Sequence, residues 1–148
     1  MRQPLHHELN DALASVLDEM QQRAEQLQTT LEAERAALDI ADAPALDAAG
    51  SRKQALMQQL EQLDAERRLL QRQQPVSDAS HELRWAQILQ VLRHCHALNL
   101  RNGSLVNQRL AQLRQALAIL TGHAGEGELY GSGGELHGSL RSKSLAAA

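Results

Sequence analysis

The residues best suited to chemistry in this chain meet in the run His94-Cys95-His96. Imidazole and thiolate groups are common metal ligands, so the run raises the question of a metal site. Neighbouring side chains on a helix point about 100° apart, so these three cannot converge on one ion. Cys95 falls on an apolar stripe, and the two histidines flank it. We therefore expect a buried thiol beside two boundary histidines, and no metal.

The other motifs of catalysis and cofactor binding are missing. Neither His7-Glu8 nor His81-Glu82 is followed by the second histidine of a zinc protease, and no glutamate has a histidine three residues later, as di-iron bundles require. The run from Gly131 to Gly134 resembles a phosphate loop only superficially, because no strand precedes it and no helix follows. The chain is therefore expected to be no enzyme and to need no cofactor.

Nucleic acid is an equally poor fit. The arginines of the third predicted helix scatter around its circumference instead of forming a basic stripe. The net charge of the chain is −3, and its two aromatic residues, Trp85 and Tyr130, cannot form a base-stacking platform. We expect a solvated face there, complementary at most to an acidic protein partner.

Composition indicates an all-α protein. Leu, Ala and Gln contribute 27, 23 and 17 residues, and all three favour helices. Val, Ile and Thr together contribute only ten residues and Phe none, so the residues that favour strands are scarce.

Apolar residues recur at gaps of three and four along three segments, which predicts three amphipathic helices. The first runs from about Pro4 to Ile40. The second starts at Asp42-Ala43-Pro44, a cap followed by a first-turn proline, and ends near Gln73, although Gly50 could delay its start. The third starts after Pro75, capped by Ser77, Asp78 or Ser80, and ends near Leu120 before Gly122. The predicted seams are Leu9, Leu13, Val16, Met20, Ala24, Leu27, Leu31 and Leu38; Leu46, Ala49, Lys53, Leu56, Leu60, Leu63, Arg67 and Leu70; and Trp85, Ile88, Leu92, Cys95, Asn99, Asn102, Val106, Leu110, Leu113, Leu117 and Leu120.

Short connections between these helices favour an antiparallel, coiled-coil-like bundle over residues 1–121, a helical hairpin with a long third helix against it. Residues 122–148 form a separate tail, because they contain seven of the nine glycines and few large apolar residues.

The third helix carries the candidate binding surface. Asn99 and Asn102 lie on its apolar seam and Gly103 follows, which indicates either a packing notch against the other two helices or the close approach of a partner. Beyond this notch the apolar face widens, which favours a partner helix. The candidate binding residues are Asn99, Asn102, Gly103, Leu105, Val106, Leu110, Leu113, Leu117 and Leu120.

Several features point to the cytoplasm. Pro4, His6, His7 and Glu8 stand where a secretion leader would begin, and no apolar run approaches the ~18 residues of a membrane span. A single cysteine fits a reducing compartment. We expect no membrane insertion.

Three pieces of the sequence resemble the FlgN family of flagellar export chaperones. The run from Asn99 to Val106 is similar to the family's Asn-x-x-Asn-Gly-x-Leu-Ile/Val signature, and Leu129-Tyr130-Gly131 with Gly134 is similar to its Tyr-Gly-x-x-Gly tail motif. The seam from Lys53 to Leu70 fits the family's second helix.

The resemblance implies a cytoplasmic chaperone that binds the C-terminal segments of the hook–filament junction (hook-associated) proteins. It would prevent their early assembly and deliver them to the type III export apparatus. The third helix would hold the cargo, and Tyr130 would dock on the export gate or ATPase complex. The main alternative is a purely structural coiled-coil scaffold or complex subunit without cargo release. A homodimer is compatible with either function.

Overall fold

The computed structural model describes residues 2–74 and 78–122, and three helices occupy nearly all of that part of the chain. They are α1 (Arg2–Asp39), α2 (Ala43–Gln73) and α3 (Ala79–Leu120). No strand occurs among the described residues, so the predicted all-α fold with three long helices is confirmed.

The chain divides into two compact units, Met1–Gly103 and Ser104–Ala148. The predicted boundary between bundle and tail, after residue 121, falls inside the second unit. The tail from residue 123 onward lies outside the described residues.

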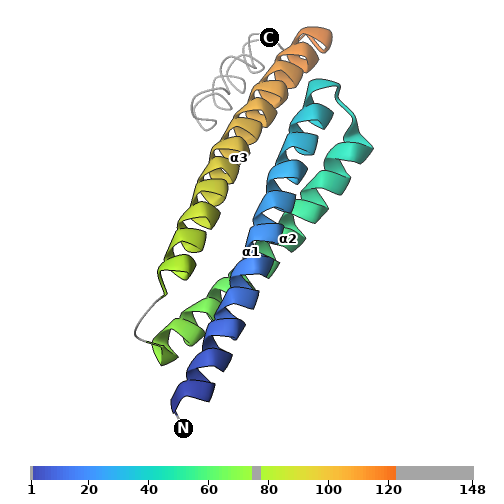
Figure 1. Ribbon diagram of the computed structural model, residues 1–148. Coiled ribbons are helices and arrows are strands. Elements are labelled where there is room, and N and C mark those ends of the chain that lie inside the picture. Colours follow the sequence, from blue (N-terminus) through green and yellow to red (C-terminus); the bar gives the residue numbers. More distant parts are fainter. Residues whose placement is uncertain (1, 75–77, 123–148) are drawn as a thin grey trace, which may run out of the picture. The chain divides into compact units, whose positions relative to one another are not determined.

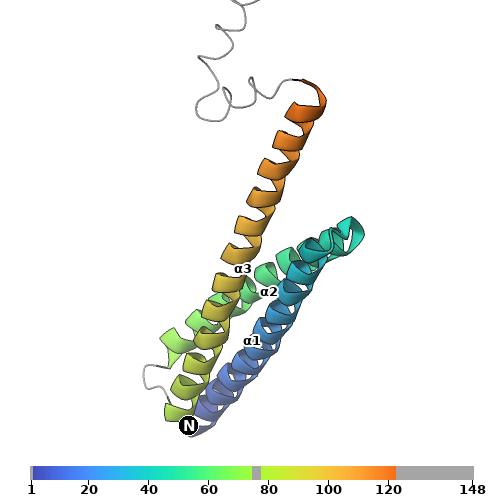
Figure 2. The same cartoon turned by 90° about the horizontal axis from the view of Figure 1, so that it is seen from above.

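The connection between α1 and α2 is set by local chemistry. Ala41 adopts a left-handed conformation with φ of 54°, and the Asp42 carboxylate accepts the Ala45 N–H at 3.1 Å to cap α2. Pro44 then occupies the first turn, where its missing N–H costs nothing. Helix α2 continues through Gly50 without a break. The resulting antiparallel hairpin of α1 and α2 is visible in both views (Figures 1 and 2).

The ends of α3 also follow the predicted signals. The Asp78 carboxylate accepts the Ser80 N–H at 3.3 Å, and the Asp78 carbonyl accepts the first helical hydrogen bond, from His81. At the other end Gly122 has φ of 74°, a conformation that favours glycine, and its N–H donates to the Ile119 carbonyl. Ser77, the third predicted cap, lies outside the described residues.

The hydrophobic core lies in the first unit and draws on all three helices. All of its members except Leu17 lie on the predicted seams, and each fully buried Leu, Ile or Met contributes about 1.5–3 kcal/mol relative to exposure. The core residues are Leu13, Val16, Leu17, Met20, Leu27, Leu31, Leu56, Leu60, Ile88 and Cys95.

A second set of contacts joins α3 to α2 near the chain reversal. The Arg67 guanidinium on α2 lies 3.7 Å from the centre of the Trp85 ring on α3, while its nitrogens bind Asp64 and Gln71. Because Arg67 is buried, its charge is balanced by the Asp64 carboxylate and by the face of the indole. These contacts explain how an arginine can occupy a seam position.

Candidate functional site

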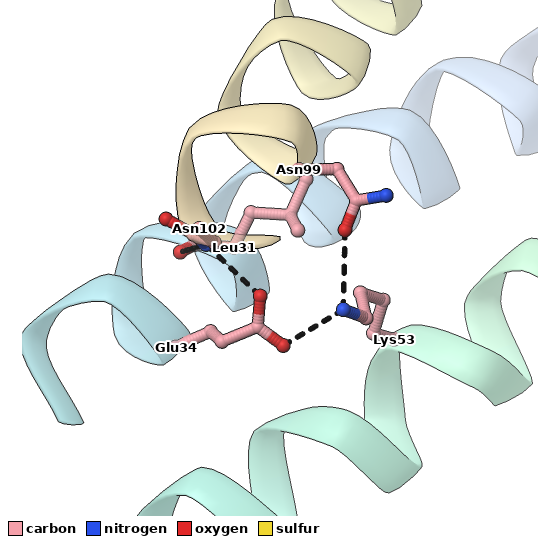
Figure 3. A network of polar contacts seen from close by, with 5 residues as sticks. All are labelled: Leu31, Glu34, Lys53, Asn99 and Asn102. Atoms are coloured by element: carbon pink, nitrogen blue, oxygen red, sulfur yellow. Dashed lines mark hydrogen bonds and ion pairs between the residues drawn. The ribbon is translucent and has the colours of Figure 1, made fainter. Parts of the chain in front are cut away.

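The polar residues on the three seams meet in one network, which Figure 3 shows from close by. Lys53 on α2 forms an ion pair with Glu34 on α1, with its Nζ 2.8 Å from Oε2, and donates to the Asn99 Oδ1 on α3 at 3.1 Å. Asn102 on α3 donates from Nδ2 to the Glu34 Oε1 and to the Leu31 carbonyl, both at 2.9 Å. Every helix of the first unit therefore contributes to it.

This network is structural in character. Asn102 is 2% exposed, and the Glu34 side chain is 8% exposed, so both are removed from water. A buried carboxylate is tolerated when it is paired and hydrogen-bonded, as Glu34 is by Lys53 and Asn102. Such contacts fit only one register of the three helices.

Of the predicted binding residues, Asn102 is thus buried inside the bundle, as the packing interpretation of this stretch predicts, whereas Asn99 is half-buried. Gly103 differs from them. It is exposed, and a Cβ at this position would meet no atom within 4 Å. The side chain of Asn102 is fully engaged with α1, so we leave it out of the docking surface proposed below.

Glu34 is the network residue that sequence reasoning missed. The seam predicted for α1 passes from Leu31 directly to Leu38, because a charged residue on this helix is expected to face water. Two signals could have found it: the seven-residue gap itself, which is two helical turns, and the polar residues Lys53 and Asn102 on the other two seams.

Beyond Gly103 the apolar stripe of α3 is largely uncovered. Leu105 and Val106 are half-buried. The next four members of the stripe, at spacings of three and four, are exposed by 45 to 81%: Leu110, Leu113, Leu117 and Leu120. These residues remain candidates for partner binding. Tyr130, predicted to dock at the export gate, lies outside the described residues.

A cleft of about 240 Å³ opens between α2 and α3 within the first unit. Its lining combines leucines from all three helices and Cys95 with polar residues at the rim: Leu27, Leu31, Lys53, Met57, Leu60, Glu61, Leu92, Cys95, His96 and Asn99. Met57 is 45% exposed there, so apolar surface faces water at this opening.

The thiol and the histidines lie as predicted. Cys95 is buried and its Sγ–H donates to the Ala24 carbonyl on α1 at 3.6 Å, whereas His94 and His96 are exposed. Burial raises the pKa of the Cys95 thiol above its ordinary value, because the thiolate would lose its hydration.

The described residues contain neither a metal-binding cluster nor a membrane-spanning helix. No group of three or more His, Cys, Asp or Glu side chains in residues 2–74 and 78–122 could hold a metal ion. In the same part of the chain, no helix combines the length and the hydropathy that crossing a membrane requires.

Comparison with known proteins identifies relatives of this chain. No solved structure is significantly similar to it. The flagella synthesis proteins FlgN of Salmonella typhimurium (strain LT2) and of Salmonella typhi are each 30% identical to it over 131 residues, which cover 87% of this chain and 93% of the relative. The family model described as FlgN protein matches residues 1–138. This match extends over nearly the whole sequence, and the chain belongs to the FlgN family.

Proposed function

We propose that this protein acts in flagellum synthesis as a cytoplasmic export chaperone for hook–filament junction proteins. It binds their C-terminal segments, prevents premature assembly and delivers them to the type III export apparatus. Family membership and the names of the Salmonella relatives support the flagellar part of the proposal. One observation on the chain itself carries the binding part, the exposed leucine stripe of α3.

Large apolar side chains at helical spacing cost free energy while they face water. Leu110, Leu113 and Leu117 are about half exposed, so each would gain about half of the ~1.5–3 kcal/mol that burying a fully exposed leucine gives. An amphipathic helix is the partner that matches such a stripe, because its own apolar residues repeat at the same spacing. Cargo segments that assemble through helices have this pattern, and covering it prevents assembly.

The decisive experiment uses Leu113→Asp, with Gln112→Asp as the matched control on the neighbouring exposed position. Leu113 is 55% exposed, so we expect circular dichroism and the melting temperature of the variant to stay unchanged. Calorimetric titration with the C-terminal peptide of a hook-associated protein should show binding weakened at least about tenfold, or ~1.4 kcal/mol. Unaltered binding, or loss of helical signal, would contradict the docking role of this stripe.

Delivery is proposed to depend on Tyr130. Tyr130→Ala should leave cargo binding unchanged and reduce capture of the chaperone–cargo complex by the export gate or the ATPase complex. If the same substitution weakened cargo binding instead, Tyr130 would belong to the cargo surface.

A scaffold would behave differently from a chaperone. An obligate structural subunit buries more than about 2,000 Å² and stays oligomeric on dilution. The proposed chaperone should remain soluble without cargo and should exchange it, which analytical ultracentrifugation with and without the peptide distinguishes.

A further inference from the structure

The cleft between α2 and α3 has the dimensions of a side-chain pocket. Its volume of about 240 Å³ is below the ~300–1,000 Å³ of sites that hold drug-sized ligands. Its walls are mainly apolar, from Leu27 and Leu31 of α1 to Leu60 of α2 and Leu92 of α3. A pocket of this size and character suits one or two large apolar side chains.

Two glycines lie beyond the residues that line this cleft, one on α2 and one on α3. Gly50 is seven residues before Met57 on α2, and Gly103 is seven residues after His96 on α3. Seven residues are two helical turns, so each glycine shares the face of a residue that lines the cleft. Both helices therefore lack a side chain on the cleft-facing side at these positions.

The two glycines also lie at the same level. Lys53 bonds to Asn99 and Arg67 contacts Trp85, an order of pairs that makes α2 and α3 antiparallel. Gly50 comes three residues before Lys53 and Gly103 four residues after Asn99. At ~1.5 Å per residue, both are displaced from that bond by similar distances in the same direction.

No contact among the described residues explains these glycines. Both have ordinary helical conformations, and a Cβ at either position would meet no atom within 4 Å. A glycine inside a helix is unfavourable relative to alanine unless something must approach its backbone closely. No part of the described chain does so at either position, which leaves both backbones open to the close approach of a partner.

We propose that this groove, bounded by Gly50 and Met57 on α2 and by His96 and Gly103 on α3, receives a helix of the cargo segment. The partner helix passes over the two glycines at close range and inserts a large apolar side chain into the cleft. The assignment of the helix to the cargo rests on the function proposed above.

Charge defines the chemistry of the docking helix further. From Leu83 to Leu120, α3 contains no Asp or Glu, and it exposes His96 at the cleft and Arg93 about one helical turn before His96. The α2 side of the cleft contributes Glu61 instead. The complementary occupant is an amphipathic helix whose apolar face is bordered by carboxylates on the side of α3.

Gly103→Leu and Gly50→Leu test the groove directly, because a Cβ at either position meets no described atom within 4 Å and the rest of the leucine side chain would occupy the space that the docking helix needs. Gln90→Leu is the matched control, since Gln90 is exposed on α3 two residues from Leu92 and faces away from the cleft. We expect all three variants to keep their helical signal. Binding of the hook-associated C-terminal peptide should weaken at least about tenfold for the two glycine variants and not for the control.

The charge complementarity is tested with Arg93→Glu, which should weaken binding of the same peptide and reduce the salt dependence of that binding. If both glycine variants bound the peptide normally while Leu113→Asp still weakened its binding, the groove proposal would be overturned. The proposed function would then remain in place. If the wild-type protein failed to bind the peptide at all, both would be overturned together.

Discussion

Asn102 on α3 donates its side-chain amide to the Glu34 carboxylate on α1 at 2.9 Å, 68 residues away in sequence. The same nitrogen donates to the Leu31 carbonyl one turn earlier on α1. Both bonds can form at only one position of α3 along α1, because a shift of α3 by one residue would separate the groups. A hydrophobic residue in place of Asn102 would tolerate such a shift, so the network gives the bundle its register.

Asn102→Ala should destabilise the bundle by about 1–3 kcal/mol, because it removes two buried hydrogen bonds and leaves an acceptor of Glu34 unpaired. Asn107→Ala is the control, an exposed asparagine on the same helix whose loss should change the free energy of unfolding by less than about 0.5 kcal/mol. Urea denaturation of both variants measures the difference. Equal effects would mean that the bonds of Asn102 contribute nothing net.

Lys53→Met should be more costly than Asn102→Ala, at about 3–5 kcal/mol, because it leaves the buried Glu34 carboxylate without its cation. The double variant Glu34→Leu/Lys53→Met replaces both charges by apolar groups and should recover much of that loss. A double-mutant cycle with the two single variants isolates the coupling. If the double variant were less stable than Lys53→Met alone, the pair would not be the source of the effect.

Sequence predicted the helices well because their boundaries depend on local chemistry. Asp42 and Pro44 start α2, Asp78 starts α3 and Gly122 follows its end, and each acts within a few residues of its own position. Leu17 is buried but does not lie on the predicted stripe. A stripe with spacings of three and four residues omits sequence neighbours that a core of three helices also buries.

The polar network could be predicted only in part. Periodicity placed Lys53, Asn99 and Asn102 on the seams but could not say what each one meets. Glu34 is buried only because Lys53 and Asn102, on two other helices, satisfy its oxygens. That pairing depends on how the helices are staggered, which is a long-range property absent from any single window of sequence.

Arg67 and Arg68 offer a matched test of burial. Both bind the carboxylate of Asp64, but only Arg67 is buried and stacked on Trp85. Arg67→Met should cost about 1–3 kcal/mol in unfolding free energy and alter the fluorescence of Trp85, the only tryptophan of the chain. Arg68→Met should cost less than about 1 kcal/mol, because its side chain is 65% exposed. Similar losses from the two variants would contradict a special role of the indole contact.

Cys95 should react slowly with alkylating reagents in the native protein. Burial raises the pKa of its thiol, so the reactive thiolate is scarce in the folded state and is also shielded from solvent. The sign of the linkage follows from the same shift. As the pH rises, the thiol of Cys95 loses its proton in the unfolded chain before it does so in the folded protein. The contribution of Cys95 to the free energy of unfolding is therefore fully present below the ordinary thiol pKa and declines above it.

Cys95→Ala should therefore flatten the alkaline fall in melting temperature relative to wild type, although it lowers stability overall by leaving a small cavity. Alkylation of the wild type in denaturant provides the reference rate. Fast native alkylation would show that the helices open readily around Cys95.

The last prediction concerns the glycines themselves, apart from any partner. Gly50→Ala and Gly103→Ala should each stabilise the protein by up to about 1 kcal/mol, because alanine is the better helix former and its Cβ meets nothing at either position. Gly122→Ala should give no such gain, since Gly122 has φ of 74° and an L side chain there costs about 1–2 kcal/mol. Thermal unfolding followed by the circular dichroism of the helices compares the stability of the three variants directly. A loss of stability in Gly50→Ala would mean that its backbone already packs against something in the free protein, and the open groove between α2 and α3 would then need another explanation.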